Sequence, residues 1–173
     1  MHTAADALTR KLLIIGNSGS GKSALSERLA RLSAQPIFDL DLIHWHEDGR
    51  KRDEEASRSL LAAIVGQPIW IIEGVYGWLA EVAVPHATAL IWTDLPWAEC
   101  RSGLLRRGLR PGMTEADQAA LLSWAEAYWS RSTPSSAAGH ERLFEAFRGQ
   151  KVRLTTRQDV DGLLARLGIE MPN

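Results

Sequence analysis

The sequence predicts a single α/β domain built around a mainly parallel β-sheet, and two observations lead to this prediction. Short apolar runs alternate along the chain with longer segments of helical periodicity. The apolar runs are also continuous rather than alternating, which is typical of strands buried on both faces of a parallel sheet. A chain of 173 residues fits one domain, and we assign residues 1–173 to it.

The expected elements follow one another in strand–helix order. The first strand is the apolar run Leu12–Ile15, and Leu25 and Leu29 then lie on one face of a helix. Thr114 and Asp117 have the spacing of a capping box, which predicts the start of a later helix. The expected strands are 12–15, 36–40, 69–72, 88–93 and 152–155; the expected helices begin at about 22 and then span about 53–65, 96–107, 114–131, 140–148 and 160–167.

The composition excludes several classes of protein. A formal net charge of −1 argues against a uniformly basic nucleic-acid binder, although 16 of the 20 basic residues are arginine. No apolar stretch approaches the roughly 20 residues needed to span a bilayer, so we expect no membrane partner. A single cysteine, Cys100, excludes an intrachain disulfide framework and is compatible with the cytoplasmic location that we expect.

One motif carries the main functional prediction. The segment after the first strand matches G-x-x-x-x-G-K-[ST] in full, and a chance match is expected in on the order of one such chain in a hundred. Its backbone N–H groups and the following helix N-terminus would hold phosphates, its lysine would reach the β- and γ-phosphates, and its last serine would ligate Mg²⁺. We therefore expect ATP and Mg²⁺ to bind at Gly16, Asn17, Ser18, Gly19, Ser20, Gly21, Lys22 and Ser23.

A carboxylate at the end of a neighbouring strand is needed to organise the Mg²⁺. Glu73 directly follows the apolar run 69–72, and ligands gather at the carboxyl ends of strands in open α/β sheets. We predict that Glu73 and Ser23 form the metal site. Asp94, after the fourth strand, competes for this role, but we interpret it as a helix N-cap.

The end of the second strand supplies candidates for the acceptor side. Strand alternation would send the carboxylates of Asp39 and Asp41 to the same side, and either is a candidate to take the proton of an acceptor hydroxyl. We favour Asp41 because it lies further toward the carboxyl end. Trp45 either borders the acceptor or packs in the core, and Arg52, in the basic triplet 50–52, is a candidate for binding a phosphate group of the acceptor.

An acid-free segment, 100–114, contains four arginines and a glycine-containing stretch, 108–112, that is typical of a hinge. Arginines of a closing lid can neutralise the charge that develops in phosphoryl transfer, and we assign Arg106, Arg107 and Arg110 to this role and Arg101 to the nucleotide. Arg106 and Arg107 are adjacent on the helix, so they diverge by about 100° and should not meet the same phosphate. Arg157, after the fifth strand, is placed to face the purine base or the lid.

Several motifs together resemble one family. The segments Gly16–Ser23, Phe38–Asp41 with Trp45, Trp70–Gly74 with Tyr76, and Asp94–Pro96 resemble the adenylate-kinase-related P-loop proteins called topology-modulation proteins or putative nucleotide kinases. The resemblance covers residues 11–168. It implies a three-layer P-loop fold with strand order 2-3-1-4-5, an acceptor-binding region near 42–66 and a helical lid near 101–135. On its motifs we add Gly74 and Tyr76 to the acceptor-binding residues.

The functional expectation is an ATP- and Mg²⁺-dependent kinase that phosphorylates a small molecule, with nucleotides and nucleosides among the candidate acceptors. Lys22 and the loop hold the phosphates, Asp41 is the base, and the lid arginines stabilise the transferring group. The alternative is a regulatory nucleotide-binding protein whose occupancy switches a partner with little transfer chemistry.

Overall fold

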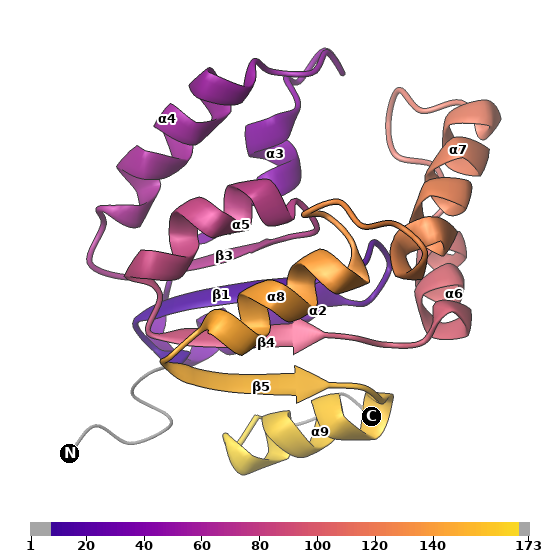
Figure 1. Cartoon of the computed structure of the whole chain (residues 1–173). Helices are drawn as coiled ribbons and strands as arrows, with labels where there is room; N and C mark the ends of the chain where they lie inside the picture. Colours follow the sequence, from indigo (N-terminus) through magenta and orange to yellow (C-terminus); the bar gives the residue numbers. More distant parts are fainter. Residues whose placement is uncertain (1–7, 170–173) are drawn as a thin grey trace.

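Five parallel strands form one twisted sheet at the centre of the molecule (Figure 1). The computed structural model describes residues 8–169, so both ends of the domain that we assigned to 1–173 lie outside the described residues. The strand order is β2-β3-β1-β4-β5, which confirms the predicted fold class and order. The strands are β1 Lys11–Gly16, β2 Ile37–Asp39, β3 Trp70–Gly74, β4 Ala89–Thr93 and β5 Gln150–Leu154.

Helices cover both faces of the sheet and stand beyond one of its ends. In Figure 1, α2 and α9 lie on one face and α5 and α8 on the other, while α6 and α7 rise beyond the carboxyl ends of the strands. The helices are α2 Lys22–Ser33, α3 Leu40–His44, α4 Glu54–Val65, α5 Gly77–Ala83, α6 Trp97–Arg107, α7 Glu115–Glu126, α8 Ala137–Ala146 and α9 Arg157–Arg166, with 3₁₀ turns η1 Val84–His86 and η2 Ala127–Trp129.

The alternation of side chains along β1 divides the core into two layers. Leu13 and Ile15 belong to the cluster under α4, α5 and α8, whereas Leu12 and Ile14 belong to the cluster under α2 and α9. All four side chains are fully buried. Burial on both faces explains why the sequence of this strand is continuously apolar.

The second strand is shorter than predicted because a helix begins inside the predicted range 36–40. The Asp39 side chain accepts a hydrogen bond from the backbone N–H of Asp41 (2.8 Å) and thereby caps α3. The chain consequently leaves the strand at Asp39, and the prediction that Asp39 and Asp41 are related by strand alternation is wrong. Helix α5 was also not predicted.

Helix starts follow their capping side chains. The capping box of Thr114 and Asp117 at the start of α7 is confirmed. A second box, of Thr156 and Asp159, starts α9 at Arg157, three residues before the predicted start, and Ser136 likewise caps α8. The helix expected over 114–131 is divided, since α7 ends at Glu126 and η2 follows.

Within residues 8–169, none of the helices has both the length and the apolar character required to cross a membrane.

Candidate active site

The loop between β1 and α2 lies at the carboxyl end of the central strand and is held close to α6. Gly19 has a φ of 80°, and a Cβ there would lie 2.1 Å from the carbonyl oxygen of Cys100. A Cβ on Gly103, in α6, would lie 2.3 Å from the carbonyl oxygen of Gly19. Only glycine permits this backbone contact, which fixes the loop against α6.

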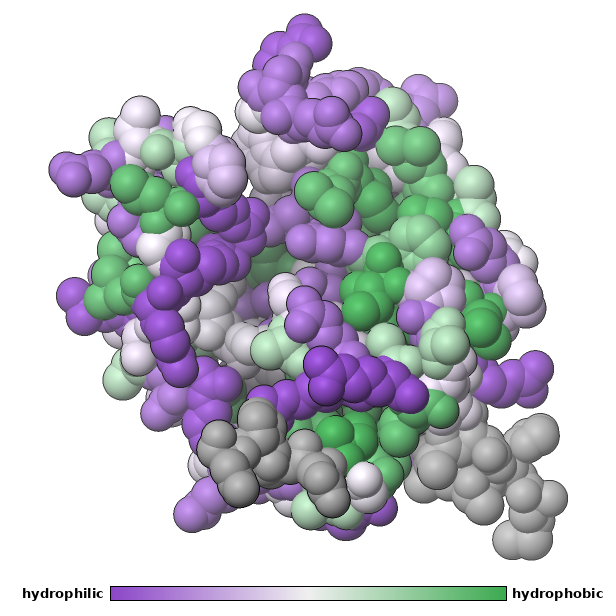
Figure 2. Space-filling model, turned by 180° about the vertical axis from the view of Figure 1, so that it is seen from behind, coloured by the Kyte–Doolittle hydropathy of each residue, from purple (hydrophilic) through white to green (hydrophobic). Residues whose placement is uncertain are grey.

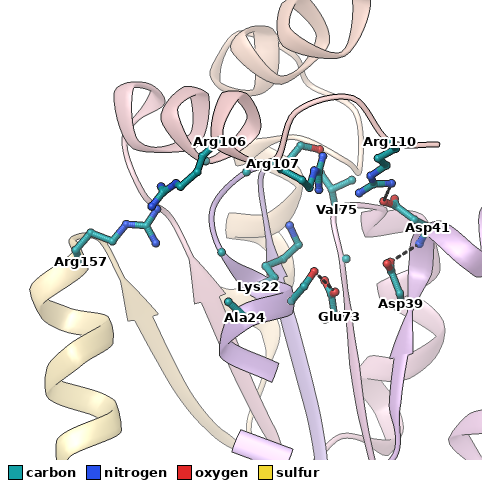
Figure 3. A pocket seen from close by; sticks show the side chains of 16 residues that line it. Lys22, Ala24, Asp39, Asp41, Glu73, Val75, Arg106, Arg107, Arg110 and Arg157 are labelled. Carbon is teal, nitrogen blue, oxygen red and sulfur yellow. Dashed lines mark hydrogen bonds and ion pairs between the residues drawn. The ribbon is translucent and has the colours of Figure 1, made fainter. Parts of the chain in front are cut away.

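Lys22 and Ser23, the first residues of α2, both line one cavity, in which Figure 3 shows the side chain of Lys22. The Lys22 ammonium donates to the carbonyl oxygen of Asn17 (2.8 Å) and is mostly buried. The Ser23 hydroxyl donates to Oε1 of Glu73 (2.6 Å). The structure therefore brings Ser23 and Glu73 together, as predicted for the metal site.

The donor set suits Mg²⁺. The hydroxyl of Ser23 and the carboxylate of Glu73 are hard oxygen ligands, and Glu73 is only 3% exposed. Mg²⁺ is usually held by one or two protein oxygens together with phosphates and water. Across residues 8–169, no group of three or more His, Cys, Asp and Glu side chains forms a dedicated metal cage. These residues fit an ion that arrives with the nucleotide.

The cavity above the loop has a volume of about 390 Å³ and unites two predicted groups of residues. Three carboxylates approach it from β2, α3 and β3, and three arginines approach it from α6 and the loop that follows it. Figure 3 shows Arg107 and Glu73 near Lys22, Arg110 beside Asp41, and Arg106 directed toward Arg157. The lining residues are Ser18, Gly19, Gly21, Lys22, Ser23, Ala24, Asp39, Asp41, Glu73, Gly74, Val75, Gly103, Arg106, Arg107, Arg110 and Arg157.

The carboxylates differ in their surroundings. Burial, together with the nearby negative charges of Asp41 and Glu73, raises the pKa of Asp39 to about 6. Asp41 forms an ion pair with Arg110 (3.1 Å) across the mouth of the cavity. Asp94 lies elsewhere: it pairs with Arg153 (2.6 Å), and α6 has no side-chain cap, so the N-cap interpretation of Asp94 is wrong.

The arginines divide between two directions. Arg107 points toward Lys22 and Val75, whereas Arg106 points toward Arg157 from the opposite side of α6 (Figure 3). The divergence expected for adjacent helical residues is therefore present. Burial lowers the pKa of Arg107, and the positive charge of Arg110 lowers it further. Arg101 is exposed and lines neither this cavity nor the second one described below.

The acceptor-side residues are only partly brought together. Gly74 lines the cavity, while Trp45 donates from Nε1 to the hydroxyl of Tyr76 (2.9 Å) beside it. Burial and the charge of Asp41 raise the pKa of Tyr76. Arg52 lies outside the lining and donates from Nε to the carbonyl oxygen of Ile43 (3.0 Å), closing the end of α3.

A second cavity, of about 290 Å³, lies on the other side of the loop between β1 and α2. This cavity was not predicted from the sequence. It lies between α2 and α9. The signal was present, because its residues on both helices recur at the spacing i, i+3, i+4, i+7. The lining residues are Ser20, Gly21, Ala24, Leu25, Arg28, Thr93, Arg106, Arg157, Val160, Asp161 and Leu164.

Comparisons with known proteins reveal likeness in structure but not in sequence. No family model matches the chain, and no curated protein matches it. Solved structures do match over nearly their whole length. They include a sugar kinase from Janibacter sp. HTCC2649 (17% identity, 93% of this chain and 95% of that chain, TM-score 0.52) and a gluconokinase from Sinorhizobium meliloti 1021 (19% identity, 92% and 94%, TM-score 0.52).

The shikimate kinase from Acinetobacter baumannii, solved in complex with shikimate, is similar over 95% of this chain and 96% of its own, with 13% identity and a TM-score of 0.55. At these identities the likeness establishes the fold and no more. The topology-modulation proteins that the motifs resemble are not among these neighbours. The chain therefore has the three-layer α/β fold shared by P-loop kinases of small molecules.

Proposed function

We propose that the protein is a kinase that transfers the γ-phosphoryl group of ATP, with Mg²⁺, to a hydroxyl group of a small molecule. The observation that carries this proposal is the cavity above the loop. It has Lys22 at its floor, carboxylates on one side and lid arginines on the other. Phosphoryl transfer needs this combination of phosphate binding, a proton acceptor and mobile positive charge.

Each group has a role in this proposal. Lys22 leaves the carbonyl of Asn17 and binds the β- and γ-phosphates, and Arg107 neutralises the equatorial oxygens of the transferring group. Ser23 and Glu73 hold Mg²⁺, which supplies charge neutralisation on the phosphates when bound. The acceptor oxygen forms a bond to the γ-phosphorus as the bond to the β–γ bridging oxygen breaks, and the hydroxyl proton passes to the carboxylate of Asp41.

The charges around the cavity favour an acceptor that has hydroxyl groups but no phosphate of its own. Within the region 42–66, Arg52 faces the end of α3, Arg50 pairs with Asp48, and Arg58 lies over Trp78. No basic side chain of that region lines the cavity. Carboxylates bind hydroxyl groups well. The solved neighbours named for sugars, gluconate and shikimate support the same class of acceptor.

The second cavity is the proposed site of the nucleobase. It adjoins the loop through Gly21 and Ala24, and Arg106 and Arg157 line both cavities. Leu25 and Leu164, both buried, give it apolar walls suited to the faces of a base. Arg106 thus belongs to the nucleotide in this proposal, and Arg107 and Arg110 to the transferring group. The cytoplasmic location stays part of the proposal.

The test is phosphate transfer from ATP to a panel of sugars, polyols, hydroxy acids, nucleosides and nucleotides. We expect one small hydroxylated acceptor to be phosphorylated, Lys22→Ala to abolish turnover, and Asp41→Asn to abolish transfer while sparing ATP binding. A nucleotide switch would instead hydrolyse ATP slowly and equally with every member of the panel. If Lys22→Ala turns over ATP at the wild-type rate, the proposal that the protein is a kinase is refuted.

A further inference from the structure

Among the described residues that line the second cavity, one side chain, that of Asp161, is negatively charged. This carboxylate caps no helix and pairs with no described residue. Asp161 lies on α9, one helical turn beyond Arg157. Within residues 8–169 its carboxylate is exposed and makes no hydrogen bond or ion pair. Asp159, two residues earlier, is by contrast fully used in capping α9.

The other polar groups of the cavity are either occupied or positively charged. Ser20 and Thr93 bond to each other (2.7 Å), and Thr93 donates to the carbonyl oxygen of Ile15 (3.2 Å). Arg157 donates from Nε to Glu99 (3.0 Å). Asp161 is therefore the one acceptor-only side chain that a ligand in this cavity would meet on the described walls.

The position of Asp161 determines which part of a nucleotide it can meet. In the proposed function the phosphates bind at the N-terminus of α2, and the cavity extends from there along the facing sides of α2 and α9. Leu25 and Leu164 provide apolar surface for the faces of a ring, so its polar edge is left for Asp161. A carboxylate only accepts hydrogen bonds, and the donor on the outer edge of adenine is its 6-amino group.

We propose that Asp161 determines base specificity by accepting a hydrogen bond from the 6-amino group of adenine. This inference rests on the proposed function, because it requires the nucleotide to lie along the loop with its base between α2 and α9. It assigns a role to a residue that no sequence motif marks. It also explains why an unpaired negative charge lies among the arginines of this cavity.

The experiment measures the dissociation constants of Mg²⁺ complexes of ATP, purine riboside triphosphate, ITP and GTP by calorimetry. Purine riboside triphosphate lacks the 6-amino group, and ITP has a carbonyl oxygen in its place. We expect the wild type to bind ATP roughly tenfold or more tightly than purine riboside triphosphate, and ITP more weakly still. In Asp161→Ala, ATP and purine riboside triphosphate should bind within about twofold of each other.

Asp161→Asn gives a result that a merely structural role would not produce. Its amide N–H can donate to the 6-oxo group, so ITP should gain affinity relative to ATP. Glu27→Gln removes an exposed carboxylate of α2 outside the cavity and should leave every ratio unchanged.

Two results would overturn the inference alone: a preference for ATP over purine riboside triphosphate that survives in Asp161→Ala, or a change confined to the ratio of GTP to ITP. The proposed function fails separately if Lys22→Ala binds and turns over ATP like the wild type, whereas absence of all triphosphate binding in the wild type would refute both.

Discussion

Single residues in the cavity differ in how they are held, and Asp39 shows the consequence most clearly. Its carboxylate caps α3, lies beside Glu73 across the β2–β3 pairing, and has Asp41 two residues away. Burial and these two negative charges favour the protonated acid. The residue is therefore a source of pH dependence in the unliganded protein.

Stability should fall as Asp39 ionises. Its pKa is about 6 in the folded protein and 3.8 in a free side chain, so its stabilising contribution is complete below about pH 4 and is lost as the pH rises through 6. Asp39→Asn still caps α3 and should remove this loss. The loss in the free energy of unfolding is at most about 3 kcal/mol, and it is smaller where water reaches the carboxylate. Urea unfolding of both proteins between pH 4 and 7 measures it. Parallel curves for the variant and the wild type would contradict the prediction, and Glu27→Gln controls for the loss of a carboxylate elsewhere.

Contacts between whole elements explain how the loop is held. The backbones of Gly19 and Gly103 touch, so the phosphate-binding loop and the middle of α6 form one unit. On the other side of the loop, the side-chain amide of Asn17 donates to the carbonyl oxygen of Ala125 near the end of α7 (2.8 Å). The loop thus contacts both helices of the predicted lid.

Gly103→Ala should force α6 away from the loop. Because the new Cβ would meet backbone rather than a flexible side chain, we expect a loss of about 1–3 kcal/mol in the free energy of unfolding and weaker ATP binding. Gly162→Ala in α9 is the matched control, since its nearest neighbour is the end of Arg166 at 3.7 Å. That variant should gain up to about 1 kcal/mol from the helix preference of alanine. Equal unfolding free energies for the two variants would disprove the close contact.

A buried chain of hydrogen bonds joins β4, η2 and α8 with the loop that follows β3. The indole N–H of Trp92 donates to the hydroxyl of Tyr128 (3.1 Å), which bonds to Nδ1 of His140 (2.6 Å), and Nε2 of His140 bonds to the carbonyl oxygen of Val75 (3.0 Å). Burial lowers the pKa of His140 to about 3, so the ring is neutral. The tautomer that fits has its proton on Nε2 and accepts at Nδ1. This chain connects η2, which directly follows α7, with Val75 in the lining of the cavity above the loop.

Tyr128→Phe should be costly because it leaves Nε1 of Trp92 and Nδ1 of His140 without a hydrogen-bond partner in the core. An unsatisfied buried group costs about 1–3 kcal/mol, so a loss of about 2 kcal/mol or more is expected in thermal or urea unfolding. Tyr76→Phe is the control: its hydroxyl accepts from the more exposed Trp45, and the loss should stay below about 1 kcal/mol. A loss for Tyr128→Phe no larger than that for Tyr76→Phe would argue against the chain.

At the scale of the whole molecule, an ion pair joins α3 with the loop after α6 on opposite sides of the cavity. Arg110 lies in the loop after α6, and Asp41 lies in α3. Figure 2, in which the molecule is seen from behind, shows the hollow between these two sides. Gly108 and Gly112 flank Arg110 with φ of 69° and 82°, and a Cβ at either would meet nothing within 4 Å. The loop therefore has room to move, and it carries an arginine that already reaches the acceptor side.

Arg110→Ala should separate catalysis from stability. The ion pair is partly exposed (43% for Arg110 and 26% for Asp41), so its loss should change the free energy of unfolding by less than about 1 kcal/mol. Turnover should fall by about a hundredfold or more if Arg110 stabilises the transferring group. Arg142→Ala, an exposed arginine of α8 outside both cavities, should leave turnover unchanged. Turnover in Arg110→Ala within about threefold of the wild type would remove Arg110 from the reaction.

Sequence reasoning succeeded where the signal is local. The apolar runs predicted the sheet, and the loop motif predicted the place of Lys22 and Ser23. Glu73 could be chosen because strand ends share one edge of a parallel sheet. The start of α3 was missed since it depends on one capping bond of Asp39, and the second cavity was missed because its two walls come from helices over 100 residues apart.

The two anchors of the loop limit how the lid can move and how it can change. Gly103 and Ala125 both contact the short loop between β1 and α2. The segment between these two residues is therefore held at both of its ends. Residues 108–114 lie at its far turn. Length and sequence can therefore vary there without disturbing the anchors, and an exchange of this stretch alone would replace Arg110 while Arg106 and Arg107 stay in α6. Under the proposed function, a new acceptor preference would be easiest to engineer at this turn, because the loop that binds the phosphates is held by other contacts.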